Sequence, residues 1–121
     1  MATVLTDDGK AIIAGRIKGT GTEPNYIAIG TGTTAADAAD AALETEVETR
    51  ANGTSSVVTT TVTNDTYRTT GTVTATGARA VTEAGTLDAA SSGNLAIRSV
   101  FSVINLSTDD TITITADLVI S

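Results

Sequence analysis

The sequence predicts a mainly β protein, an antiparallel β-sandwich with one short N-terminal helix. About a fifth of the residues are threonine, and they cluster with valine and isoleucine, residue types that favour strands. About six such runs are separated by turn-forming residues, and one segment shows clear helical spacing of apolar residues. Because helices and strands do not alternate along the chain, a sandwich is favoured over an α/β fold.

The length predicts one domain over residues 1–121, because a chain of this size does not supply a second independent core. Its core is expected to be thin. Apolar residues make up 40% of the chain, but most are Ala and Val, and the aromatic residues are Tyr26, Tyr67 and Phe101. Surface buried between copies adds to the stability of a thin core, so we expect a homo-oligomer, with a trimer favoured.

The first quarter of the chain contains an arm, a helix and a strand. Residues 1–5 are expected to form a flexible N-terminal arm or a strand that pairs with a sheet edge. Apolar residues at helical spacing predict a helix over residues 6–18, capped by Thr6 or Asp7 and ended by Gly19. The apolar run at 26–29, enclosed by turn formers, predicts a short buried strand.

The next segment is rich in glycine and then in acidic residues. Gly30 and Gly32 lack a GxGxxG or Walker pattern, so a flexible strand exit is favoured over a phosphate-binding loop. The carboxylates that follow could supply oxygen ligands for a hard cation; they are Asp37, Asp40, Glu44, Glu46 and Glu48. Their spacing does not match an EF-hand, so a solvated acidic loop or short helix over 34–47 is favoured. We expect no metal and no cofactor.

The second half carries the clearest strands. Thr/Val-rich runs at 57–63 and 67–76 flank Asn64–Asp65, which predicts a hairpin. Further strands are predicted at 79–83, 95–104 and 111–120, with a loop at 88–94. The last strand alternates aliphatic and threonine residues, so one of its faces is expected to be buried.

Strand 95–104 is apolar on both faces, as expected of a central strand or one that meets a neighbouring subunit. Phe101 lies on one predicted face with Leu95, Ile97 and Val103, and Val100 and Ile104 lie on the other. We therefore predict a subunit or capsid interface that includes Val100, Phe101 and Ile104, although a monomer core would use these side chains equally well.

Composition and charge narrow the function classes. The chain has no histidine, cysteine or tryptophan, so most catalytic and metal-binding arrangements are missing, and we expect no enzyme. A carboxylate pair such as Glu44 and Glu83 could still serve a glycoside hydrolase, but few aromatic residues are present to line its cleft. Fourteen acidic against seven dispersed basic residues disfavour nucleic-acid binding. No signal peptide or membrane span is predicted, which favours assembly in a cytoplasm.

Several segments together resemble a family of small bacteriophage virion structural proteins. They are 6–10 to Gly19, 26–33, 41–46, 63–67, 81–90, and Asn94–Leu95 with Arg98 and Phe101. The resemblance covers nearly the whole chain and implies a small β-sandwich of the phage head or tail. The chain departs from the family where Thr86–Leu87 replaces a Leu-Phe pair and where Ala116–Asp117 replaces a common aromatic residue.

The resemblance implies two roles in the virion. A capsid decoration or cement protein would bind outside the head, contact the major capsid protein and stabilise the shell. A tail, baseplate or fibre component, either an adaptor or a receptor-binding module, is the alternative. Sugar recognition would use exposed aromatic residues, but Tyr26 and Tyr67 fall in predicted strands, where a core role is favoured. The short acidic domain without a repetitive shaft favours the cement role.

Overall fold

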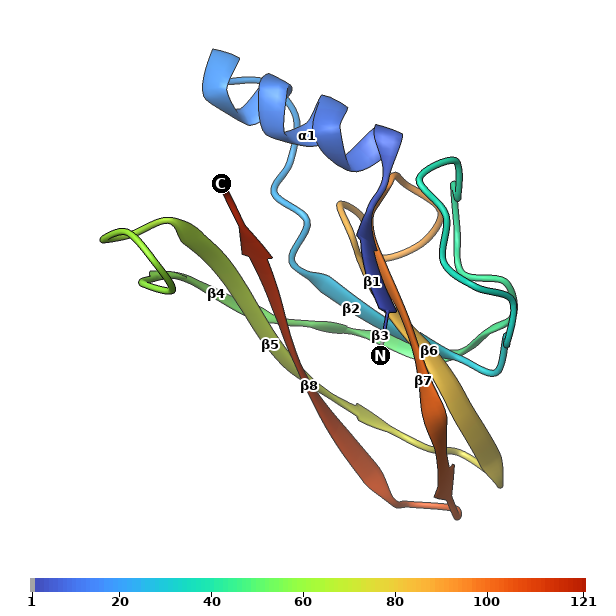
Figure 1. Cartoon of the computed structure of the whole chain (residues 1–121). Helices are drawn as coiled ribbons and strands as arrows, with labels where there is room; N and C mark the ends of the chain where they lie inside the picture. The colour runs from blue at the N-terminus through green and yellow to red at the C-terminus, as the bar shows by residue number, and fades with distance from the viewer. Residues whose placement is uncertain (1) are drawn as a thin grey trace.

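The computed structural model describes residues 2–121, which form eight strands and one helix (Figure 1). The elements are β1 Ala2–Leu5, α1 Asp7–Lys18, β2 Tyr26–Gly30, β3 Glu46–Asn52, β4 Thr54–Val58, β5 Thr66–Thr74, β6 Arg79–Leu87, β7 Leu95–Leu106 and β8 Thr111–Val119. One sheet has the order β1-β7-β6-β2-β3 and the other β4-β5-β8, and all strand pairs are antiparallel. The predicted antiparallel sandwich with one N-terminal helix is confirmed.

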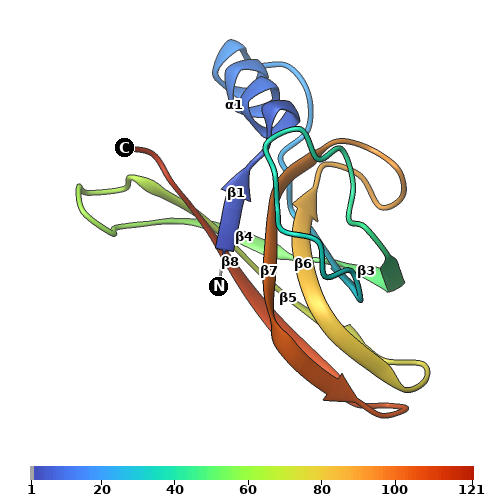
Figure 2. The same cartoon turned by 45° about the vertical axis from the view of Figure 1, so that its right-hand side comes forward.

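Helix α1 begins and ends where the sequence predicts. The Thr6 hydroxyl accepts a hydrogen bond from the Gly9 amide at 2.9 Å, which caps the first turn. Gly19 adopts the left-handed conformation, with φ of 92°, and ends the helix. A Cβ on Gly9 would lie 2.3 Å from the carbonyl oxygen of Ala96 in β7. This glycine therefore lets the helix approach the sheet closely (Figure 2).

The N-terminal arm is the edge strand of the larger sheet. β1 pairs with β7 in the register Ala2↔Val100 to Leu5↔Ile97, and Figure 2 shows the two strands side by side. The Thr3 and Ser99 hydroxyls are hydrogen-bonded to each other across this pair. The arm thus lies on the sheet of its own chain.

The segment 34–47, predicted as an acidic loop or a short helix, is a loop up to Thr45, and its last two residues, Glu46 and Val47, begin strand β3. The chain remains irregular up to Thr45, but residues 46–52 form a strand that pairs with β2. The open edge of β2 provides these residues with backbone partners that only an extended segment can use. Gly53 then separates β3 from β4, so the chain passes from one sheet to the other with a single residue between strands.

The predicted hairpin around Asn64–Asp65 is present, but its first strand is shorter and lies earlier than predicted. β4 ends at Val58, and residues 59–65 form a loop in which Asn64 has a positive φ of 61°. The Asp65 carboxylate accepts hydrogen bonds from the amides of Thr60, Thr61 and Val62 at 2.8–2.9 Å. These bonds curl the segment and divert its amides from a strand ladder.

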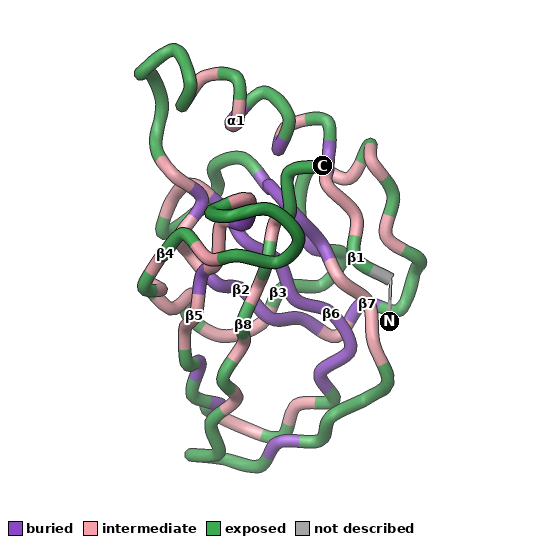
Figure 3. The backbone as a smooth tube through the Cα atoms, turned by 60° about the vertical axis from the view of Figure 1, so that its left-hand side comes forward, coloured by how far each residue is buried: buried purple, intermediate pink, exposed green. Residues whose placement is uncertain are grey.

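The two sheets are staggered, so they cover each other only in part. β5 packs across on β2 and β3, and β8 packs on β6. Among the described residues, β4 on one flank and β7 and β1 on the other lack a comparable partner in the opposite sheet. The main core lies where the sheets overlap, and its buried members are Ile27, Ile29, Val73, Ala75, Val81, Ala84 and Leu106. Figure 3 shows burial concentrated on β2, β6 and part of β7, whereas β8 alternates between intermediate and exposed.

An irregularity in β7 changes the faces that its side chains occupy. Val81 pairs with Ile104 but Glu83 pairs with Val100, so β7 spans four residues where β6 spans two. The predicted regular alternation from Phe101 to Val103 is therefore broken. Val103 is 53% exposed, and Ile104 lines a groove together with Phe101.

Candidate functional site

An open groove runs along β8, on the flank where the larger sheet extends beyond the smaller one. Figure 1 shows β7 and β8 diverging from the turn that joins them. The groove has a volume of about 630 Å³. Its apolar walls come from Ile97, Phe101 and Ile104 of β7, Ala84 of β6, and Ile114 and Ala116 of β8. We call it the β8 groove.

The structure divides the three residues of the predicted interface. Phe101 is half-buried and packs against the main core, and it also faces the β8 groove. Ile104 lines the same groove and is 43% exposed. Val100 is not among the groove residues; it pairs with Glu83 on one side and with β1 on the other. Phe101 and Ile104 thus share one surface, whereas Val100, which is also half-buried, does not line it.

A second groove, of about 540 Å³, separates α1 from the three-stranded sheet. Ile12, Ile13 and Ile17 form its helical wall, and Val57 of β4 and Leu118 of β8 lie opposite. We call it the α1 groove. Ile17 is 84% and Val57 60% exposed, so apolar side chains are open to solvent here.

A small polar cluster interrupts the α1 groove. The Glu23 carboxylate accepts hydrogen bonds from Ser55 at 2.5 Å and from the Tyr67 hydroxyl at 3.2 Å. Burial and the nearby Glu23 charge raise the pKa of Tyr67. Tyr67, considered above for sugar recognition, is therefore a half-buried wall residue whose hydroxyl is held by Glu23.

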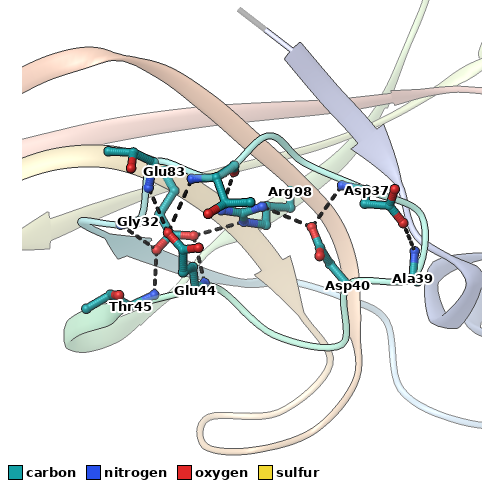
Figure 4. Close-up of polar contacts among 10 residues, drawn as sticks. Gly32, Asp37, Ala39, Asp40, Glu44, Thr45, Glu83 and Arg98 are labelled. Carbon is teal, nitrogen blue, oxygen red and sulfur yellow. Dashed lines mark hydrogen bonds and ion pairs between the residues drawn. The ribbon is translucent and has the colours of Figure 1, made fainter.

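The most deeply buried charges form an ion pair between β6 and β7. Arg98 donates from Nε to Glu83 Oε1 at 2.9 Å, and the two residues are 2% and 0% exposed. Arg98 also donates to Asp40 at 2.9 Å and to the Thr34 carbonyl at 3.0 Å. Figure 4 shows these bonds reaching from the sheet into the irregular loop 31–45.

Glu83 completes this network through backbone amides. Its Oε2 accepts from Gly32 at 2.9 Å and from Thr45 at 2.8 Å, and its Oε1 accepts from Glu44 at 2.9 Å. Burial alone would raise the pKa of Glu83, but these amides and Arg98 outweigh burial and hold the pKa below its ordinary value. The ion pair thus anchors both ends of the loop 31–45 to the sheet.

The acidic stretch that could have supplied a cation site is dispersed among separate partners. Asp40 binds Arg98, Glu46 binds Arg50 and Glu48 binds Arg79. Glu44 accepts hydrogen bonds from the Thr33 and Thr34 amides. Within residues 2–121, no group of three or more His, Cys, Asp or Glu side chains is placed to hold a metal ion.

The glycines considered for a phosphate loop serve the ion pair. A Cβ on Gly30 would lie 2.5 Å from Glu83 Oε2, and a Cβ on Gly32 would lie 2.6 Å from the same atom. The Gly32 amide already donates to that carboxylate. These glycines therefore allow the loop to close over Glu83, and the Gly32 amide is not available to a phosphate.

The carboxylate pair considered for glycoside hydrolysis has a similar structural role. Glu83 is fully buried and receives four hydrogen bonds, so it has no contact with solvent through which a substrate could reach it. Glu44 holds the start of the loop through the Thr33 and Thr34 amides.

The described helix is too short to cross a membrane.

The Glu83–Arg98 pair was missed by sequence reasoning, although the chain contains a signal for it. Both charges lie within otherwise apolar or small-residue strands, and a charge in such a strand requires a partner when it is buried. The antiparallel register that brings them together, with Gly85 opposite Arg98, depends on pairing across the loop 88–94.

Comparison with protein-family models, curated proteins and solved structures gives no significant match.

Proposed function

We propose that this chain is a bacteriophage virion structural protein, a capsid decoration or cement protein that binds the outside of the head. The observation that carries the proposal is the staggered sandwich, which leaves apolar inner faces of both sheets open in the β8 and α1 grooves. Open apolar surface of this kind marks a protein that is covered by neighbours in an assembly. The resemblance to small virion proteins supports a virion as that assembly.

The mechanism is mechanical reinforcement of the shell. A subunit that contacts the major capsid protein on both sides of a capsomer boundary adds contacts that must break before the shell opens. The buried ion pair supports such a role, because it holds the loop 31–45 in one conformation before binding. The net charge of −7 keeps the free protein soluble before it reaches the head.

The test is electron cryomicroscopy of intact virions that carry this protein. Many copies distributed over the capsid surface are expected from the proposal. A few copies confined to the tail would replace it with the tail, baseplate or fibre role. Virions without the protein would exclude both roles.

A further inference from the structure

The four edges of the two sheets differ in how they are protected against pairing with another chain. Natural edge strands are short, charged or bulged, or are covered by another segment, which prevents such pairing. β1 has four residues, and β3 shifts its register with β2 where Glu48 has a positive φ of 66°. Residues 23–25 flank β4, since the Gly53 amide donates to the Asn25 carbonyl at 2.8 Å and Ser55 donates to Glu23. These three edges are therefore poor partners for a further strand.

β8 lacks this protection on the side away from β5. It pairs with β5 over nine consecutive residues without a register shift, and the Ile120 amide donates to the Asp65 carbonyl at 2.9 Å. Backbone groups alternate between the two sides of a strand, so the even-numbered residues of β8 direct theirs toward β5 and the odd-numbered residues toward the free edge. Within residues 2–121, β8 pairs with no strand but β5. The amides left without a backbone partner thus include those of Thr113, Thr115 and Asp117.

This free edge forms one wall of the β8 groove. Residues 113–117 all line the groove, although their side chains alternate between the two faces of the sheet, so the backbone itself borders the space. The floor includes Phe101 and Ile104 of β7, and within the described chain β7 and β1 lack a closely packed partner in the opposite sheet. Unpaired donors on the wall and apolar side chains on the floor match the two kinds of contact that an added strand makes.

We propose that the β8 groove binds an extended segment of a partner protein, which pairs with β8 as an additional antiparallel strand. Antiparallel pairing is slightly more stable per residue than parallel pairing. Every second side chain of the segment would lie opposite Ile114 and Ala116 and cover the apolar floor. The remaining side chains would lie beside Thr113 and Thr115 on the outer face, where polar residues fit. The segment therefore alternates apolar and polar residues.

The space beside β8 fits a single segment and excludes a folded copy of this chain. A sandwich seated edge to edge with β8 would place its second layer where β7 and β1 already lie. An extended segment, such as a chain terminus or an arm, has no second layer. It would fill the space above β7 and leave the larger sheet in place.

Charge indicates which residues lie at one end of the segment. The groove itself contains one charged residue, Asp117, which Arg68 compensates at 2.7 Å. Asp109 and Asp110, in the turn before β8, are exposed, and within residues 2–121 neither is in an ion pair. In an antiparallel pair the C-terminal end of the segment lies beside this turn. Lysine or arginine is therefore expected at that end.

This inference deepens the proposed function and rests on it for the source of the segment, which would be an arm of a neighbouring virion protein. The edge and the groove belong to the purified chain, so they are tested without a virion. The two proposals fail separately: a bare β8 edge leaves the place of the protein in the virion to microscopy, and absence from virions leaves the edge to the binding test.

The test measures, by fluorescence anisotropy, how a labelled peptide of sequence TVTVTVKK binds to the purified chain. Its valines would face the groove floor, and its two lysines would lie beside the acidic turn. Methylation of the threonine amides removes the donors that face β8, whereas methylation of the valine amides removes donors that face away. We expect the first change to weaken binding by about tenfold or more, and the second by less than about twofold.

Substitutions in the chain locate the bound peptide. Thr115→Pro removes an amide of the free edge, where proline is tolerated, and Thr115→Ala is its control because it keeps the amide. Ile104→Asp adds a charge to the groove, and its control is Val103→Asp, at a position that is 53% exposed and does not line the groove. We expect Thr115→Pro and Ile104→Asp to weaken binding by about tenfold, with both controls and all circular dichroism spectra unchanged.

An unmodified chain that does not bind the peptide would overturn the proposal. So would a threonine-methylated peptide that binds as tightly as its parent, or controls that lose as much affinity as Thr115→Pro and Ile104→Asp. If Thr115→Pro does not fold, Ile104→Asp and the two methylated peptides still decide the outcome.

Discussion

Replacing Glu83 with glutamine should remove much of the stability of this fold. The two carboxylate oxygens of Glu83 accept four hydrogen bonds, two at each oxygen, from three backbone amides and Arg98. A glutamine amide has one oxygen and one NH₂ group, so in either orientation two of these donors face another donor. Each buried donor left without a partner costs about 1–3 kcal/mol. The charge of Arg98 also loses its most buried partner.

We therefore expect Glu83→Gln to lower the free energy of unfolding by about 3–5 kcal/mol, the usual cost of breaking a buried ion pair. This is a large part of the about 5–15 kcal/mol that stabilises an ordinary domain. Urea unfolding followed by circular dichroism, at one fixed protein concentration, measures the change. Asp117→Asn is the control, because its bond to Arg68 lies at the surface and should be worth less than about 1 kcal/mol.

The double variant separates the ion pair from the packing around it. Once Arg98→Met has removed the cation, Glu83→Gln should cost markedly less than it does in the unmodified chain. A loss below about 1 kcal/mol for Glu83→Gln alone would refute the role given to this pair, as would equal losses for Glu83→Gln and Asp117→Asn.

Three further predictions follow from the same structure. The pKa of Glu48 is lowered from 4.5 to about 2, chiefly by the hydrogen bond from Arg79, and the pKa of Glu83 is also lowered. Both carboxylates therefore contribute stability that is present above pH 4.5 and is lost as pH falls. Acid titration of the unfolding free energy should show this loss between pH 4.5 and about 2, with a smaller slope for Glu48→Gln. Gly32→Ala should destabilise the fold by about 1–3 kcal/mol, because its Cβ would clash with Glu83 and Glu44. Gly77→Ala is the control, because no atom lies within 4 Å of its Cβ, and thermal unfolding should show it to be neutral or slightly stabilising. Phe101→Ala should cost about 2 kcal/mol in urea unfolding, less than the about 3–5 kcal/mol of a fully buried phenylalanine, because this side chain is half-buried against the main core; a loss within the fully buried range would contradict this placement.

Local sequence signals were sufficient to predict the elements whose conformation is set by residues within the element itself. Helix α1 is marked by the Thr6 cap and Gly19, and β8 by its alternation of aliphatic residues and threonine, and both lie where predicted. The first hairpin strand was misplaced, because the Asp65 carboxylate accepts hydrogen bonds from three amides of the loop. Strand propensity does not reveal such hydrogen bonds between a side chain and the backbone. β3 was missed because its strand conformation comes from pairing with β2.

Composition and periodicity by themselves determined that this protein is a β-sandwich with one helix, because strand propensity, turn residues and the period of apolar side chains are local properties. The stagger of the two sheets, the grooves on either side and the burial of Glu83 with Arg98 were decided only by the tertiary structure. Each depends on the register between segments far apart in the chain, and a shift of one residue would turn every side chain of a strand to its other face.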